Sequence, residues 1–108
     1  EGLPWEASKA FDHSAALSPR FLPLAELGGD VQRLRFELAL NGQVRQRGDT
    51  AEMIFPIDRL IAHVSQYVTL RMGDLLYTGT PVGVGPVHAG DTLRATLEGE
   101  TLLDFDIR

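Results

Sequence analysis

Hydrophobic and polar residues alternate strictly through one part of this chain, from residue 34 to residue 40. The apolar positions there are Leu34, Phe36, Leu38 and Leu40, and the run ends at Asn41-Gly42. Alternation with a period of two is typical of a half-buried strand, and Asn-Gly between two such runs is a strong hairpin signal. We therefore predict a strand that turns at Asn41-Gly42 and returns antiparallel over residues 43–47.

The period changes to that of a helix over residues 56–67. Pro56 suits the first helical turn, and Asp58 is favourably placed near the positive N-terminal end of a helix. The apolar residues that follow share one helical face; they are Ile57, Leu60, Ile61, Val64 and Val68. This pattern predicts a helix over 56–67.

Strand patterns return in the last third of the chain. Residues 93–97 and 103–107 alternate with a period of two, and Gly99 between them marks a turn. The short apolar run 75–77 predicts a further strand, whereas the prolines before Gly29 predict a loop-rich entry segment. The predicted fold is mainly β with one helix (α+β), as a curled sheet or two-layer β roll.

A run of three glycines and two prolines, residues 78–86, follows the predicted strand 75–77. Glycines let backbone amides approach a ligand, and prolines restrict φ, so we predict a shaped and rigid loop. Its backbone donors and threonine hydroxyls suit a carboxylate or a phosphate, but the lysine and spacing of a nucleotide P-loop are absent. Composition alone favours the simpler interpretation, a tight connection between two strands.

Composition narrows the classes of function. The chain has 108 residues, enough for one domain, and a formal net charge of -5, which disfavours nucleic acid as a partner. No apolar stretch approaches the length of a membrane span. The sequence contains no cysteine, which excludes disulfides and thiolate metal sites and favours a cytoplasmic location.

Three further groups of residues are candidate sites. Asp12-His13-Ser14 contains the residue types of a hydrolytic triad, but adjacent side chains cannot align for that chemistry. Asp104 and Asp106 would share one strand face, which we interpret as solvated rather than as a cation site. Lys9 lies among aromatic residues where its pKa could be lowered, although its spacing alone indicates a surface lysine.

Several short segments occur in a fixed order along the chain. They are Gly2-Leu3-Pro4-Trp5, Lys9-Ala10-Phe11-Asp12, Asn41-Gly42, Arg45-Gln46, Met53-Ile54, Gly73-Asp74 and the run 78–86. Read together, they resemble the fumarylacetoacetate hydrolase family, in particular its acylpyruvate and fumarylpyruvate hydrolases and related isomerases and decarboxylases. The resemblance covers residues 1–108 as the C-terminal part of the catalytic domain.

The resemblance implies a mixed β-roll, incomplete in this chain, and a homodimer. It also implies a Mg²⁺ or Mn²⁺ ion that is chelated by a small 2-oxo acid substrate. Lys9 matches the family's active-site lysine, which stabilises developing enolate charge. Thr80, with Gly79 beside it, matches the loop that holds the substrate carboxylate. Both roles are physically reasonable, because fixed donors and cations stabilise developing negative charge.

The metal ligands of the family, a Glu-x-Glu pair and a later Asp, lie upstream of the segment that matches Gly2, and none has a counterpart here. Glu98-Gly99-Glu100 has the right form but lies in a predicted turn downstream of the 78–86 loop, so we assign no metal ligand. The resemblance implies carbon-carbon bond hydrolysis, isomerisation or decarboxylation by the full-length protein, and an inactive isolated chain. The alternatives are a non-catalytic carboxylate-binding or dimerisation module and a purely structural β domain.

Overall fold

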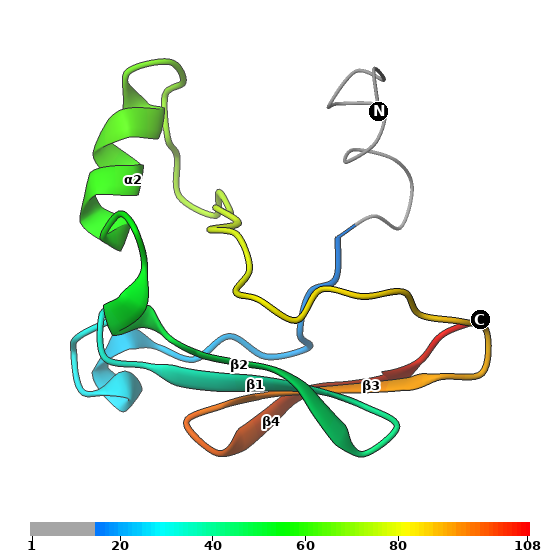
Figure 1. The fold of residues 1–108 in the computed structure, drawn as a ribbon. Helices are drawn as coiled ribbons and strands as arrows, with labels where there is room; N and C mark the ends of the chain where they lie inside the picture. The colour runs from blue at the N-terminus through cyan, green and yellow to red at the C-terminus, as the bar shows by residue number, and fades with distance from the viewer. Residues whose placement is uncertain (1–14) are drawn as a thin grey trace.

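A computed structural model describes residues 15–108 of the chain (Figure 1). Lys9 and Asp12-His13-Ser14 lie outside the described residues. The elements in chain order are the 3-10 helix η1 (Leu24–Leu27), the strands β1 (Arg35–Leu40) and β2 (Gln43–Asp49), the 3-10 helix η2 (Thr50–Glu52), the helix α2 (Ile57–Ser65) and the strands β3 (Thr92–Leu97) and β4 (Glu100–Asp106).

The four strands form one antiparallel sheet in the order β2-β1-β3-β4. Asn41 and Gly42 turn the β1–β2 hairpin with φ values of 51° and 82°, and positive φ at both central residues is what a tight hairpin turn needs. The predicted hairpin is confirmed, and its second strand extends to Asp49. The predicted final strands and the turn at Gly99 are confirmed as well.

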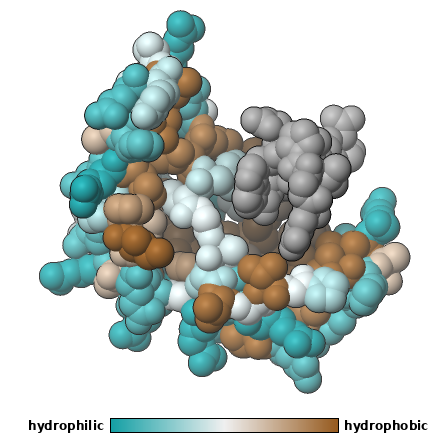
Figure 2. All heavy atoms as spheres, turned by 45° about the horizontal axis from the view of Figure 1, so that its top comes forward, coloured by the Kyte–Doolittle hydropathy of each residue, from teal (hydrophilic) through white to brown (hydrophobic). Residues whose placement is uncertain are grey.

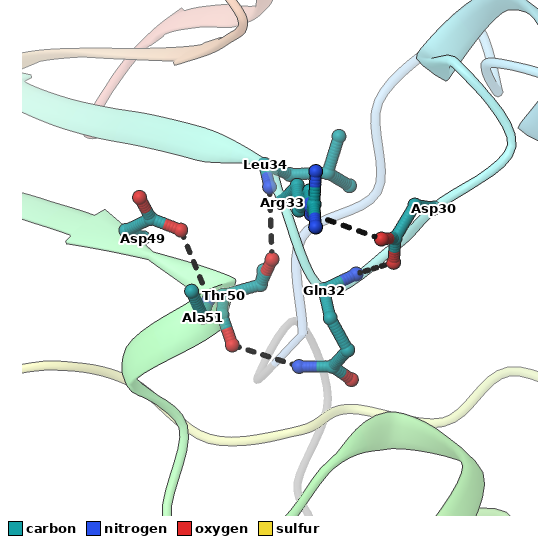
Figure 3. A network of polar contacts seen from close by, with 7 residues as sticks. All are labelled: Asp30, Gln32, Arg33, Leu34, Asp49, Thr50 and Ala51. Atoms are coloured by element: carbon teal, nitrogen blue, oxygen red, sulfur yellow. Dashed lines mark hydrogen bonds and ion pairs between the residues drawn. The ribbon is translucent and has the colours of Figure 1, made fainter.

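Polar contacts fix the end of β2 beside the start of β1 (Figure 3). The Thr50 hydroxyl accepts a hydrogen bond of 2.9 Å from the Leu34 backbone N–H, and the Thr50 carbonyl accepts one of 2.8 Å from Gln32 Nε2. The Gln32 side-chain oxygen also accepts from the backbone N–H of Ile57, the first residue of α2. Since the first N–H groups of a helix lack intrahelical partners, Gln32 caps α2 from a distant segment.

The helix prediction is confirmed, with Pro56 just before the first helical residue. Figure 1 shows α2 standing away from the sheet rather than packing across it. Its apolar face is only partly covered, because Leu60 and Val64 are half-buried while Ile61 is exposed. No helix within residues 15–108 has the length and apolar character needed to cross a membrane.

The strand predicted over residues 75–77 is wrong, because the structure shows no strand there. A strand needs a neighbour to complete its backbone ladder, and this segment is instead an extended connection that leads from α2 back over the sheet (Figure 1). Leu75 and Tyr77 are 53% and 59% exposed. Tyr77 is held at its tip, where its hydroxyl donates to the carbonyl of Ala16 over 3.1 Å.

Little of the apolar surface is buried. Among the described residues only Leu34, at 6% exposure, is a buried hydrophobic residue, whereas Ile54 is 91% and Val82 88% exposed. The accessible surface of 9018 Å² compares with roughly 6,000 Å² for a globular protein of this mass. Figure 2 shows apolar residues gathered on the inner side of the part of the molecule that contains α2. The prediction of a mainly β fold with one helix is confirmed by the four-stranded sheet and α2.

Candidate substrate-anchoring site

The 78–86 loop is docked on strand β2 through a single side chain. Gln46 Nε2 donates hydrogen bonds of 2.7 Å to Thr80 Oγ1 and 2.9 Å to the carbonyl oxygen of Pro81. Gln46 and Pro81 are half-buried, while Thr80 remains exposed. One amide group therefore fixes two consecutive loop residues and leaves the threonine accessible to a ligand.

The glycines of the loop have different roles. Gly83 has φ of 106°, and a Cβ on it would overlap the carbonyl oxygen of Arg45 on β2. Only glycine allows this backbone approach. Gly79 has φ of 94°, but no atom of residues 15–108 lies within 4 Å of its Cβ position, so it permits the turn without a close neighbour in this part of the chain. Gly85 has no positive φ, and its Cβ position likewise has no close neighbour among these residues.

The exit of the loop is anchored to the β1–β2 hairpin. Asp91 accepts hydrogen bonds from Asn41 Nδ2 over 3.0 Å and from the His88 backbone N–H over 2.8 Å. The bond from Asn41 is the main reason that the pKa of Asp91 is lowered, and the bond from His88 adds to it. Asn41 also accepts from the Thr92 N–H at the start of β3. Hydrogen bonds thus hold the loop itself through Gln46 and the segment that follows it through Asp91.

These contacts separate the two interpretations of the glycine-rich run. The loop does not tightly connect two strands, because the segment before it is not a strand and β3 begins only at Thr92. The prediction of a shaped loop is confirmed by its docking on β2. Gly79 and Thr80 are both exposed, as a carboxylate-binding role requires. Their proposed partner, Lys9, lies outside the described residues, so that pairing stays a prediction.

Gln46 is the residue of this site whose role could not be predicted from the sequence. In the sequence, Gln46 is notable only as part of the Arg45-Gln46 segment that carries the family resemblance. The sequence places Gln46 between two other polar residues, Arg45 and Arg47, and only the structure shows that Gln46 is half-buried while both arginines are exposed. No local pattern identifies Thr80 as the partner of Gln46, because the two residues are 34 positions apart.

The carboxylates of residues 15–108 do not form a metal centre. No group of three or more His, Cys, Asp or Glu side chains within this part of the chain could hold an ion. Asp104 pairs with Arg94 at 3.0 Å, and Asp106 accepts a 2.8 Å hydrogen bond from the Thr92 hydroxyl. Both aspartates are exposed, which confirms the predicted solvated strand face.

Glu98 and Gly99 form the predicted turn, whereas Glu100 is the first residue of β4. Glu98 accepts from the Arg35 backbone N–H over 3.4 Å, and Glu100 forms an ion pair with Arg20. A hard divalent cation prefers several oxygen ligands around one point. The described residues therefore do not fit the divalent metal that the resemblance implies.

Comparison with known proteins decides the family. The family model described as "Fumarylacetoacetate (FAA) hydrolase C-terminal" matches residues 1–107. The chain belongs to the fumarylacetoacetate hydrolase family. It is 50% identical over 101 residues to oxaloacetate tautomerase YcgM of Escherichia coli K12, a match that covers 94% of this chain and 46% of that protein.

Solved structures of the family share the fold. A fumarylacetoacetate hydrolase family protein of Yersinia pestis CO92 matches with a TM-score of 0.91 and 48% identity, over 99% of this chain and 49% of that one. A maleylpyruvate hydrolase of Sphingobium sp. SYK-6, in complex with manganese (II) ion and pyruvate, matches with a TM-score of 0.69 and 36% identity, over 72% and 30% of the two chains. Members of the family thus include hydrolases and isomerases, and the present chain spans about half the length of its curated relatives.

Proposed function

We propose that this chain is the C-terminal part of the catalytic domain of an enzyme that forms or consumes the enolate of a small 2-oxo acid. The observation that carries the proposal is the docking of the 78–86 loop, in which Gln46 holds Thr80 exposed at the surface. The Thr80 hydroxyl and the backbone of Gly79, which has no side chain in the way, lie at one exposed turn and suit a substrate carboxylate. Donors that are fixed before the ligand arrives need no reorganisation when negative charge develops.

Keto-enol tautomerisation of oxaloacetate is the reaction favoured by the relatives. The Escherichia coli tautomerase is 50% identical over nearly the whole chain, whereas the Sphingobium hydrolase is 36% identical over 72% of it. In the keto-to-enol direction the C3–H bond breaks, its electron pair forms the C2=C3 double bond, and the C2 oxygen gains a proton. No water is consumed, in contrast to the hydrolysis of an acylpyruvate.

Thr80 and Gly79 would hold the carboxylate next to the C2 oxygen, and Lys9 would stabilise the negative charge on that oxygen in the enolate. These roles are the same whether the enolate is protonated at carbon, released by carbon-carbon cleavage or formed by decarboxylation. The upstream half of the enzyme would therefore decide which reaction follows.

A divalent ion, Mg²⁺ or Mn²⁺, is proposed as the cofactor of the full-length enzyme. The manganese in the Sphingobium relative supports this choice. Residues 15–108 provide no cluster of ligands, and the family resemblance places the metal ligands upstream of the segment that matches Gly2. The 108-residue chain alone is therefore proposed to be inactive.

Turnover by the full-length protein and by the 108-residue chain, each with the enol form of oxaloacetate and with an acylpyruvate, tests the proposal. We expect the full-length protein to accelerate loss of the enol in the presence of Mg²⁺, to lose this activity in EDTA, and to recover it with added Mg²⁺. The 108-residue chain should not exceed the rate in buffer. No turnover of either substrate by the full-length protein would contradict the proposal.

The second candidate is a non-catalytic carboxylate-binding or dimerisation module. The exposed apolar residues favour it, since a monomeric soluble protein rarely leaves a large apolar patch uncovered. A homodimer is also proposed for the enzyme, so assembly alone does not separate the two candidates. Binding of oxalate without turnover by the full-length protein would favour the module.

A further inference from the structure

We infer that Gln46 is a positioning residue that leaves the Thr80 hydroxyl only one free role, as a hydrogen-bond donor toward the ligand. The inference rests on the proposed function, in which that ligand is a substrate carboxylate. It concerns a side chain outside the set of residues that would touch the substrate.

The orientation of the Gln46 amide follows from the chemistry of Pro81. A carbonyl oxygen can only accept, and the Pro81 oxygen lies 2.9 Å from the amide group. If the amide were reversed, two carbonyl oxygens would face each other at that distance. The NH₂ group must therefore face the loop, and its second hydrogen points to Thr80 Oγ1, which lies at 2.7 Å.

The direction of the Thr80 hydroxyl follows in turn. An amide NH₂ has no acceptor capacity, so Thr80 Oγ1 must accept from Gln46. A hydroxyl has one hydrogen to donate, and that hydrogen must point away from the Gln46 nitrogen. Within residues 15–108, Thr80 Oγ1 makes no other hydrogen bond. The free O–H on this exposed residue is thus available to an acceptor from solution.

A carboxylate is such an acceptor, because the ionised group only accepts. A threonine without this constraint could turn its hydrogen toward a neighbouring carbonyl and would have to reorient when the substrate binds. Gly83 has no side chain, which lets the loop lie close to Arg45 on the same strand as Gln46. Gln46 therefore sets the direction of the hydroxyl, and Gly83 permits the short distance between the loop and the strand.

The test substitutes Gln46 in the full-length enzyme and separates KM from kcat. Gln46→Glu keeps the size of the side chain but presents only acceptors at neutral pH, so it should capture the Thr80 hydrogen and repel the Pro81 carbonyl. We expect KM for the enol of oxaloacetate to rise by about tenfold or more, with a smaller change in kcat. The rise should shrink as the pH falls and the introduced carboxylate becomes protonated, because it can then donate again.

Gln43→Glu is the matched control, since Gln43 is exposed on the same strand and the substitution introduces the same charge. Its KM should equal that of the wild type at every pH. The thermal unfolding temperature of Gln46→Ala, compared with that of the wild type, shows how much loss of this side chain lowers the stability of the protein.

Equal KM values for Gln46→Glu and the wild type would overturn the inference. A rise in KM that does not change with pH, or that Gln43→Glu reproduces, would also overturn it. Absence of turnover in the wild type is a different outcome, because it removes the proposed function itself. The two failures are therefore distinguishable.

Discussion

Replacing Gly83 by alanine in the full-length enzyme is expected to lower kcat/KM by about 100-fold or more, the range seen when a preorganised donor is lost. Gly83 has φ of 106°, where a Cβ is strained, and its Cβ would overlap the carbonyl oxygen of Arg45. Backbone atoms cannot move aside as a side chain can. The loop must therefore leave β2, and Thr80 and Gly79 leave with it.

Gly85→Ala is the matched control within the same loop. Gly85 has no positive φ, and a Cβ there would meet no atom of the described residues 15–108 within 4 Å, so this variant should keep nearly full activity. Steady-state kinetics of the two variants, with circular dichroism to compare their secondary structure, make the measurement. Equal activity of both variants would contradict the docked loop as a requirement for function.

Replacing Lys9 by alanine in the full-length enzyme is expected to lower kcat by about 100- to 1,000-fold. The proposed role of Lys9 is to stabilise the enolate, so its charge is needed in the transition state more than in the bound ground state. KM should change less than kcat. Parallel measurement of kcat, KM and the thermal unfolding temperature checks this expectation.

Lys9→Arg separates the charge from the shape of the group. Lys9 is the only lysine of the 108 residues, and the other strongly basic side chains are all arginines. A guanidinium is broader and planar, whereas an ammonium is a compact point charge, so arginine should recover only part of the lost rate. Unchanged kcat in Lys9→Ala would remove Lys9 from the proposed chemistry.

The elements that could be predicted from the sequence are those set by local signals. Asn41 and Gly42 readily adopt the positive φ that a tight turn needs at two consecutive positions, and the hairpin forms there. Pro56 immediately precedes a helix whose apolar face has the correct period. The strand predicted over 75–77 failed for the opposite reason. A short apolar run does not specify its hydrogen-bonding partner, and the structure provides none for this segment within residues 15–108.

The candidate site likewise contains features that the sequence predicted and features that it did not. Glycine and proline content predicted a shaped loop, because both residues act on the backbone at their own positions. The Gln46–Thr80 hydrogen bond joins positions 34 residues apart, and no local pattern encodes such a pair. The overlap at Gly83 likewise depends on Arg45 of another element. The sequence thus predicted the loop that we propose to bind the carboxylate, but not the side chain on which it is docked.

The burial of apolar side chains is a further property that the sequence did not predict. The period of α2 predicted an apolar face but not what covers it, and Ile61 remains 45% exposed. Met72 and Val82, in the connection that follows, are more exposed still. Burial of such side chains would contribute roughly 1.5–3 kcal/mol each. A further polypeptide surface, from the remainder of the protein or a second copy, would account for them.

Calorimetric binding of oxalate to the full-length protein in the presence of Mg²⁺ tests most directly whether Thr80 anchors the substrate carboxylate. A hydrogen bond to a charged group contributes about 1.5–3 kcal/mol, so Thr80→Val should weaken oxalate by about 10- to 100-fold. Thr80→Ser keeps the hydroxyl and should bind within about threefold of the wild type, since less than 1 kcal/mol is then at stake. Equal affinity of the wild type and Thr80→Val would contradict the account.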